Sequence, residues 1–107
     1  MSESQGRVTI AQNVLDTIVQ LTTLNVPGVA RLGARSAFRR SKDGIHVEVV
    51  EHQVNVDVYV VVLPDVNMYE VGKTIQAEIA RAMKEIVGME VTIVNVHIQD
   101  VEAVAGP

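Results

Sequence analysis

A dense run of basic side chains lies in the first half of the chain. Five of the nine lysine and arginine residues fall within twelve positions, with a phenylalanine among them: Arg31, Arg35, Phe38, Arg39, Arg40 and Lys42. Guanidinium groups present forks of donors that match phosphates, carboxylates and anionic headgroups. The segment is therefore a candidate anion-binding or partner-binding loop. The alternative is a solvated loop whose charges only keep the domain soluble, and the sequence leaves both interpretations open.

The three histidines, His46, His52 and His97, lie on or beside predicted strands. Imidazoles bind metals, but no spacing typical of paired ligands occurs here and no cysteine completes a site. His46 and His97 fall in the polar phase of their strands, so we expect them to face away from the helices. We interpret all three as solvated residues and expect no metal.

No group of residues has the pattern of a catalytic site. Ser36 and Ser41 lie in the basic segment without the strained turn of a nucleophile. Gly72-Lys73 lacks the glycine-rich loop that cradles phosphate and falls inside a predicted helix. The sequence therefore predicts neither an enzyme nor a bound cofactor.

Length and composition indicate one domain with an aliphatic core. A chain of 107 residues is the size of a single domain. We take 1–107 as that domain, with an ordered core at about 6–101, a polar N-terminal leader and a frayed tail. Hydrophobic residues make up 48% of the chain, and most are aliphatic, with Phe38, Tyr59 and Tyr69 as the aromatics. Such a composition suits a sheet and offers little surface for stacking bases.

Charge and cysteine content bear on location and partners. The net charge of −4 disfavours a general attraction to nucleic acid or anionic lipid, although a local patch can oppose it. The absence of cysteine favours a cytoplasmic address. No stretch approaches the roughly 20 apolar residues that span a bilayer. Any membrane contact would then be peripheral or through a partner.

The first half of the chain predicts a helix followed by strands. Residues 7–10 alternate polar and apolar side chains, and helical spacing runs from there to about Leu24, with Thr9 as a candidate cap. Pro27 and Gly28 end that helix. A short strand at 29–32 and an irregular stretch follow, and then two alternating segments, 45–49 and 54–62, predict an antiparallel hairpin.

The second half predicts a helix and a final strand. Asn67 is a plausible cap for a helix to about Val87, whose apolar side contains Val71, Ile75, Ile79, Ala82 and Ile86. Gly88 ends it. The strand from Glu90 to about Val101 changes phase near Ile93, which predicts a bulge there.

These elements predict an α+β fold in the order β-α-β-β-β-α-β, counting residues 7–10 as the first strand. A strand–helix–strand crossover is normally right-handed and parallel. We therefore expect a mixed three- to four-stranded sheet with two helices packed on one face.

Several segments resemble the alkaline shock protein family of Gram-positive envelope stress response proteins. They are Arg7-Val-Thr-Ile-Ala11, Val26-Pro-Gly-Val29, the two hairpin strands and, most specifically, Val94-Asn-Val-His-Ile-Gln-Asp-Val101. The resemblance runs from about Gly6 to Val101. It implies a cytoplasmic, non-enzymatic, envelope-associated protein that forms homo-oligomers and binds proteins, including a small membrane-anchored relative. Some members are linked to the control of fatty-acid synthesis.

The main alternative is a small nucleic-acid-binding domain that uses the basic loop from Arg31 to Lys42. The order of helices and strands is compatible with some RNA-binding folds. The acidic total, the few aromatics and the lack of a GxxG loop between helices stand against it. A subunit that tunes a lipid-synthesis complex is a third possibility, which overlaps with the envelope scaffold.

Overall fold

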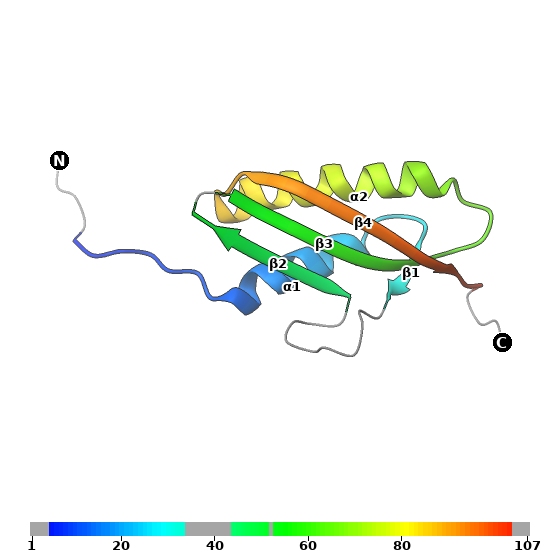
Figure 1. Cartoon of the computed structure of the whole chain (residues 1–107), viewed down its shortest axis with the longest axis horizontal. Helices are drawn as coiled ribbons and strands as arrows, with labels where there is room; N and C mark the ends of the chain where they lie inside the picture. The colour runs from blue at the N-terminus through cyan, green and yellow to red at the C-terminus, as the bar shows by residue number, and fades with distance from the viewer. Residues whose placement is uncertain (1–4, 34–43, 52, 104–107) are drawn as a thin grey trace.

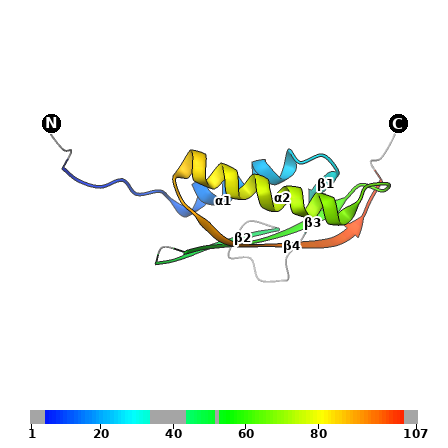
Figure 2. The ribbon, with the colours of Figure 1, turned by 90° about the horizontal axis from the view of Figure 1, so that it is seen from above.

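The computed structural model describes residues 5–33, 44–51 and 53–103. In chain order the elements are α1 (Gln12–Leu24), β1 (Val29–Leu32), β2 (Ile45–Val50), β3 (Gln53–Val62), α2 (Met68–Ala82), the π-helical turn η1 (Met83–Val87) and β4 (Val91–Val101) (Figure 1). Both helices lie on the same face of the sheet, which makes two layers (Figure 2). The expected α+β class and the helices on one face are confirmed.

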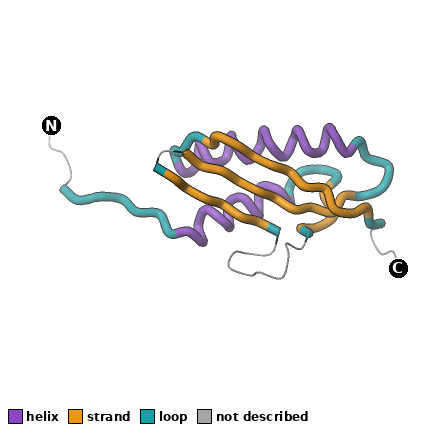
Figure 3. The backbone as a smooth tube through the Cα atoms, viewed as in Figure 1, coloured by secondary structure: helices purple, strands orange, loops and turns teal. Residues whose placement is uncertain are grey.

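Strand β3 is the centre of a four-stranded mixed sheet. β4 pairs with it in parallel along one side, as in Val56 opposite Val94. β2 and β1 both pair with it antiparallel, β2 with its first part and β1 with its last (Figure 3). Because β4 runs along the whole of β3, β1 and β2 share the other side. The outer strands are thus β4 on one flank and β2 with β1 on the other.

The end of β1 and the start of β2 meet beside Tyr59 of β3, and this meeting point requires glycine. The Gly33 N–H donates to the Tyr59 oxygen at 2.6 Å, and the Tyr59 N–H donates to the Gly44 oxygen at 2.8 Å. A Cβ on Gly44 would lie 2.7 Å from the Gly33 oxygen, and its φ of +77° also disfavours any other residue. The end of β1 and the start of β2 can therefore both meet β3 at Tyr59 because Gly44 has no side chain.

The core lies between the sheet and the helices. Alternate valines of β3, from Val54 to Val62, have no exposed surface. Ile75 and Ile79 of α2 and Met83 of η1, two elements that together we call the second helix, are equally buried, and Leu15 and Val19 of α1 complete the cluster. The period of two in β3 and the spacing of four in α2 place these side chains against one another.

The N-terminal expectations were wrong in two respects. Residues 7–10 belong to no strand among the described residues, and the side chain of Val8 is 89% exposed. The alternating pattern is present, but a strand also needs a neighbour to take its main-chain groups. Thr9 is not the cap either, since α1 begins at Gln12 after Ala11 and no side chain caps it. Gln12 instead donates its amide to the Val47 oxygen at 2.9 Å, a tertiary contact that local sequence does not reveal.

The second helix follows the sequence closely except on its apolar side. Asn67 accepts a hydrogen bond from the Glu70 N–H at 3.0 Å, and Gly88 has a φ of +81° after the last turn, so both expected ends are confirmed. The buried row continues from Ile79 to Met83, whereas Ile86 is 68% exposed. The wide π-helical turn η1 changes the phase of the last residues, and a regular helical period misplaces Ile86 for that reason.

The predicted bulge in the last strand is confirmed. The pairing of β3 with β4 shifts register between Val91 and Ile93, and it shifts again between Ile98 and Asp100. Each shift adds one residue to β4, so Val94, Val96 and Ile98 stay on the helix-covered side between them.

Candidate functional site

The sheet face without helices presents a row of polar side chains from three strands. His46 of β2 is opposite Asp57 of β3, Asp57 is beside Asn95 of β4, and Tyr59 is beside His97. Their neighbours in each strand are the buried valines and isoleucines of the core. His46 and His97 thus face away from the helices, as the alternation predicts. We call this surface the open face.

Asp57, Tyr59, Asn95 and His97 form an ordered cluster on the open face. Asp57 Oδ1 accepts a hydrogen bond from Asn95 Nδ2 at 3.2 Å and lies 3.1 Å from His97 Nε2. The imidazole of His97 is stacked on the ring of Tyr59, with centroids 4.4 Å apart and planes 11° from parallel. The side chain of His97 is 43% exposed and that of Asp57 30%. The rings are therefore held in place while one side of the stack remains open to solvent.

This geometry suits recognition more than proton transfer. In a hydrolytic triad an aspartate orients a histidine whose other nitrogen meets a nucleophile. Among the described contacts, the other neighbour of His97 is a phenol ring stacked flat on it. Immobilised aromatic rings with a polar rim are typical of protein-binding surfaces, because little side-chain entropy is lost when a partner docks.

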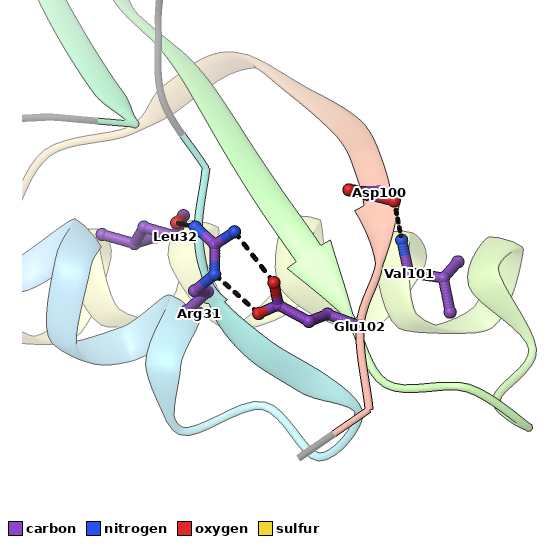
Figure 4. Close-up of polar contacts among 5 residues, drawn as sticks. All are labelled: Arg31, Leu32, Asp100, Val101 and Glu102. Atoms are coloured by element: carbon purple, nitrogen blue, oxygen red, sulfur yellow. Dashed lines mark hydrogen bonds and ion pairs between the residues drawn. The ribbon is translucent and has the colours of Figure 1, made fainter. Parts of the chain in front are cut away.

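Of the six residues proposed as a binding loop, the structure describes Arg31 alone. Arg35, Phe38, Arg39, Arg40 and Lys42 lie outside the described residues, as does His52. Arg31 makes a forked ion pair with Glu102: Nε lies 2.8 Å from Oε1 and Nη2 lies 3.2 Å from Oε2 (Figure 4). A third bond joins Nη1 to the Leu32 oxygen at 3.2 Å. The guanidinium thus holds β1 to the residue after β4, and each of its three nitrogens already donates a hydrogen bond.

The ion pair changes the pKa of both partners. The hydrogen bond from Arg31, and then its charge, lower the pKa of Glu102 below 4.5. The same two interactions with Glu102 raise the pKa of Arg31. Both side chains are about half exposed, so solvent screens the pair.

A helix glutamine binds one main-chain oxygen of β2, and another binds one of β4. The Tyr59 N–H bonds toward β2, so even-numbered residues of β3 bond toward β4. In β4, by the same alternation, Val94, Val96 and Ile98 direct their main-chain groups outward. Gln76 of α2 donates to the Val94 oxygen at 3.0 Å, just as Gln12 of α1 donates to the oxygen of Val47. The bond from Gln76 does not involve the outward main-chain groups of Val96 and Ile98.

A groove of about 220 Å³ runs along this part of β4. Val96 and Ile98 form one wall, and Met68, Tyr69, Lys73 and Gln76 of α2 contribute to the other. Met68 and Tyr69 are exposed, and the Lys73 ammonium lies 5.7 Å from the centre of the Tyr69 ring. We call this the α2–β4 groove.

A larger hollow of about 450 Å³ lies between the two helices. Thr22 and Asn25 line it from the end of α1, and Glu78, Arg81 and Ile86 line it from the second helix. Arg81 pairs there with Glu78 and, at 3.5 Å, with Glu85. The hydrogen bond and charge of Glu78 are the main causes that raise the pKa of Arg81. The charged side chains that line the hollow are therefore paired with one another.

Within the described ranges, no three side chains of His, Asp or Glu gather closely enough to hold a metal ion. None of the helices that the structure describes has the length and apolarity to cross a membrane.

Fold and site together define a small α+β domain with one covered and one open sheet face. A family model described as having a cell envelope-related function matches residues 1–103, and the chain belongs to this family, the alkaline shock protein 23 family. The resemblance seen in the sequence is thereby confirmed.

Two relatives match nearly the whole chain. It is 24% identical over 114 residues to the uncharacterized protein Spy1614 of Streptococcus pyogenes, across 97% of this chain and 94% of that protein. It is 25% identical over 105 residues to the uncharacterized protein YqhY of Bacillus subtilis, across 91% and 78%.

Among solved structures, the fold is similar to that of the MamM CTD. A nickel form of that domain has a TM-score of 0.63 at 14% identity, covering 85% of this chain and 100% of that one. A copper form has a TM-score of 0.63 at 13% identity, covering 86% and 100%. At such identity the likeness shows the fold alone.

Sequence reasoning placed the open-face histidines but missed the cluster around His97. The available signal was the polar phase of two strands expected to be parallel neighbours. It gives the shared face, but the contact of Asp57 with His97 depends on the register, which the bulge at 91–93 sets.

Proposed function

We propose that this chain is a non-enzymatic scaffold or regulatory protein of the cell envelope, acting by self-association and by binding other proteins. The observation that carries the proposal is the open face, where Asp57, itself bonded by Asn95, holds His97 in its stack on Tyr59. An immobilised, partly exposed aromatic cluster next to an unpaired outer strand is suited to docking a protein. The family's cell envelope-related function supports this direction.

The proposed site of action is the cytoplasm, at the inner face of the cell membrane. The contact with the membrane would be peripheral or through a small membrane-anchored protein. The net charge of −4 favours such a protein partner over direct attraction to anionic lipid. The pairing of Arg31 with Glu102 also removes one of the five clustered cations from the nucleic-acid alternative.

The test is recovery of the tagged chain from its native cells with mild detergent, followed by identification of the bound proteins. A double variant, Asn95→Ala with His97→Ala, removes one ring of the stack and the amide that bonds Asp57. The matched control is Lys84→Ala with Glu85→Ala, exposed positions in η1 on the helical layer. We expect wild type and control to recover a membrane-anchored protein. The amount recovered with the open-face variant should be about tenfold lower, as when a central contact is removed.

Light scattering on the pure protein tests self-association separately. Recovery of RNA and ribonucleoproteins with a monomeric pure protein would contradict the proposal and favour the nucleic-acid alternative. Equal recovery by the open-face variant and the control would remove the open face as the binding surface.

A further inference from the structure

The N-terminal residues 5–10 form an arm that has a strand's sequence but no strand partner. Arg7-Val8-Thr9-Ile10 alternates polar and β-branched apolar side chains. The side chains of Val8 and Ile10 are 89% and 42% exposed. In Figure 1 the arm leads away from α1 and from the sheet. Apolar side chains at strand spacing are therefore presented to solvent on an extended segment.

The unpaired side of β4 is the matching surface. Between Val91 and Gln99 the strand contains no Lys, Arg, Asp, Glu or Pro, the residues with which edge strands usually prevent pairing. Gln76 occupies the Val94 oxygen in the position that an N–H of a neighbouring strand would take. The outward groups of Val96 and Ile98 follow, directly beside the α2–β4 groove.

The arm of the same copy starts on the other flank of the sheet. Gln12, two residues after Ile10, is bound to Val47 of β2, and β3 separates β2 from β4. From there the arm leads away from the sheet (Figure 1). A second copy is thus the natural source of an arm for β4.

We propose that the arm of one copy adds to β4 of another as an antiparallel strand, with Val8 opposite Ile98 and Ile10 opposite Val96. This inference rests on the proposed self-association and names its contact. In that register both apolar side chains of the arm point into the α2–β4 groove beside Met68 and Tyr69. Two hydrogen-bonded pairs provide about four main-chain bonds.

Charge favours the antiparallel direction. Arg7 then lies on the open face next to Gln99 and Asp100, and Asp100 supplies a carboxylate for its guanidinium. A parallel arm would carry Arg7 toward Asn95, where the neighbouring carboxylate, Asp57, already contacts Asn95 and His97. The arm and the groove are different surfaces, so the contact is head-to-tail and either closes by mutual exchange or continues as a chain.

Cysteine pairing tests the register, because the natural chain has no cysteine. A protein with Val8→Cys is mixed with one carrying Ile98→Cys under mild oxidation, and the mixed disulfide is quantified by mass spectrometry. The control partner carries Val49→Cys, which lies on the other outer strand, β2, and is 38% exposed. We expect the mixed disulfide with Ile98→Cys at least about tenfold above that with Val49→Cys, since only directly opposed residues have Cβ atoms close enough. Equal yields, or preference for Val49→Cys, would overturn the proposal.

Light scattering then separates this inference from self-association in general. The double variant Val8→Asp with Ile10→Asp should be monomeric at concentrations where wild type is oligomeric, with an unchanged melting temperature because both residues are exposed. Leu21→Asp, at a 57% exposed position of α1, is the control and should remain oligomeric. An oligomeric arm variant would overturn arm addition while leaving self-association intact. A wild type that stays monomeric at every concentration would overturn both.

Discussion

At the scale of single residues, the ion pair of Arg31 and Glu102 joins positions 71 apart in the sequence. A carboxylate whose pKa is lower in the folded than in the unfolded state stabilises the fold above the unfolded pKa. That contribution is lost as the pH falls through the lowered value. Since Arg31 lowers the pKa of Glu102 below 4.5, Glu102→Gln should slightly reduce the melting temperature at pH 7. The difference from wild type should shrink as the pH is lowered from 4.5, measured by thermal unfolding over a pH series.

Arg31→Gln provides the companion measurement. If the two side chains act through each other, the double variant should be no less stable than either single variant. Additive losses at pH 7 would mean that each residue contributes through other contacts, such as the bond from Arg31 to the Leu32 oxygen.

The candidate site was only partly predictable at this scale. Alternation alone indicates that His46, Asp57 and His97 share the uncovered face of a sheet. It does not give the stacking of His97 on Tyr59, because that needs the register of two strands separated by a helix. Nor does composition distinguish an arginine that binds an internal carboxylate from one that is available to a ligand. Arg31 was placed in a binding loop for that reason.

At the scale of elements, the cap of the second helix is a local feature with a measurable contribution. Asn67 Oδ1 accepts the Glu70 N–H, one of the first-turn donors that have no partner within the helix. Asn67→Ala should reduce the free energy of unfolding by about 1 kcal/mol, the usual loss for a cap of this type. Urea denaturation measures it. Asn67→Asp keeps the acceptor and should retain most of the stability, and equal losses in both variants would argue against the cap.

Elements with strong periodicity were predicted well, and elements defined by a neighbour were not. The hairpin, the two ends of the second helix and the bulge near Ile93 follow from local pattern and end signals. The residues of the arm have a strand's alternation, yet no strand lies beside them. α1 begins at Gln12, whose side chain bonds Val47, 35 positions away, and not after a local cap. Local sequence gives the preference of a segment, and the rest of the chain decides whether that preference is satisfied.

At the scale of the whole molecule, stability and interaction are assigned to opposite faces of the sheet. The buried valines of β3 face the helices, and its polar residues face outward with β4 and β2 on either side. Substitutions on the open face and in the arm should therefore alter binding with little effect on folding. Substitutions between the layers should do the reverse.

Two isoleucines of the helical layer test the part of this division that concerns folding. Ile75 has no exposed surface, and Ile75→Ala would leave a cavity between α2 and the sheet that costs about 2–5 kcal/mol. Ile86 has the same side chain but is 68% exposed, so Ile86→Ala should change the free energy of unfolding by less than about 0.5 kcal/mol. Urea denaturation measures both in one series. The free energy of unfolding of a domain of this size is usually about 5–15 kcal/mol, so Ile75→Ala should remove a large part of it. Unfolding should remain a single cooperative transition. Similar losses for the two variants would mean that the end of this helix is buried in solution, by the chain itself or by another copy.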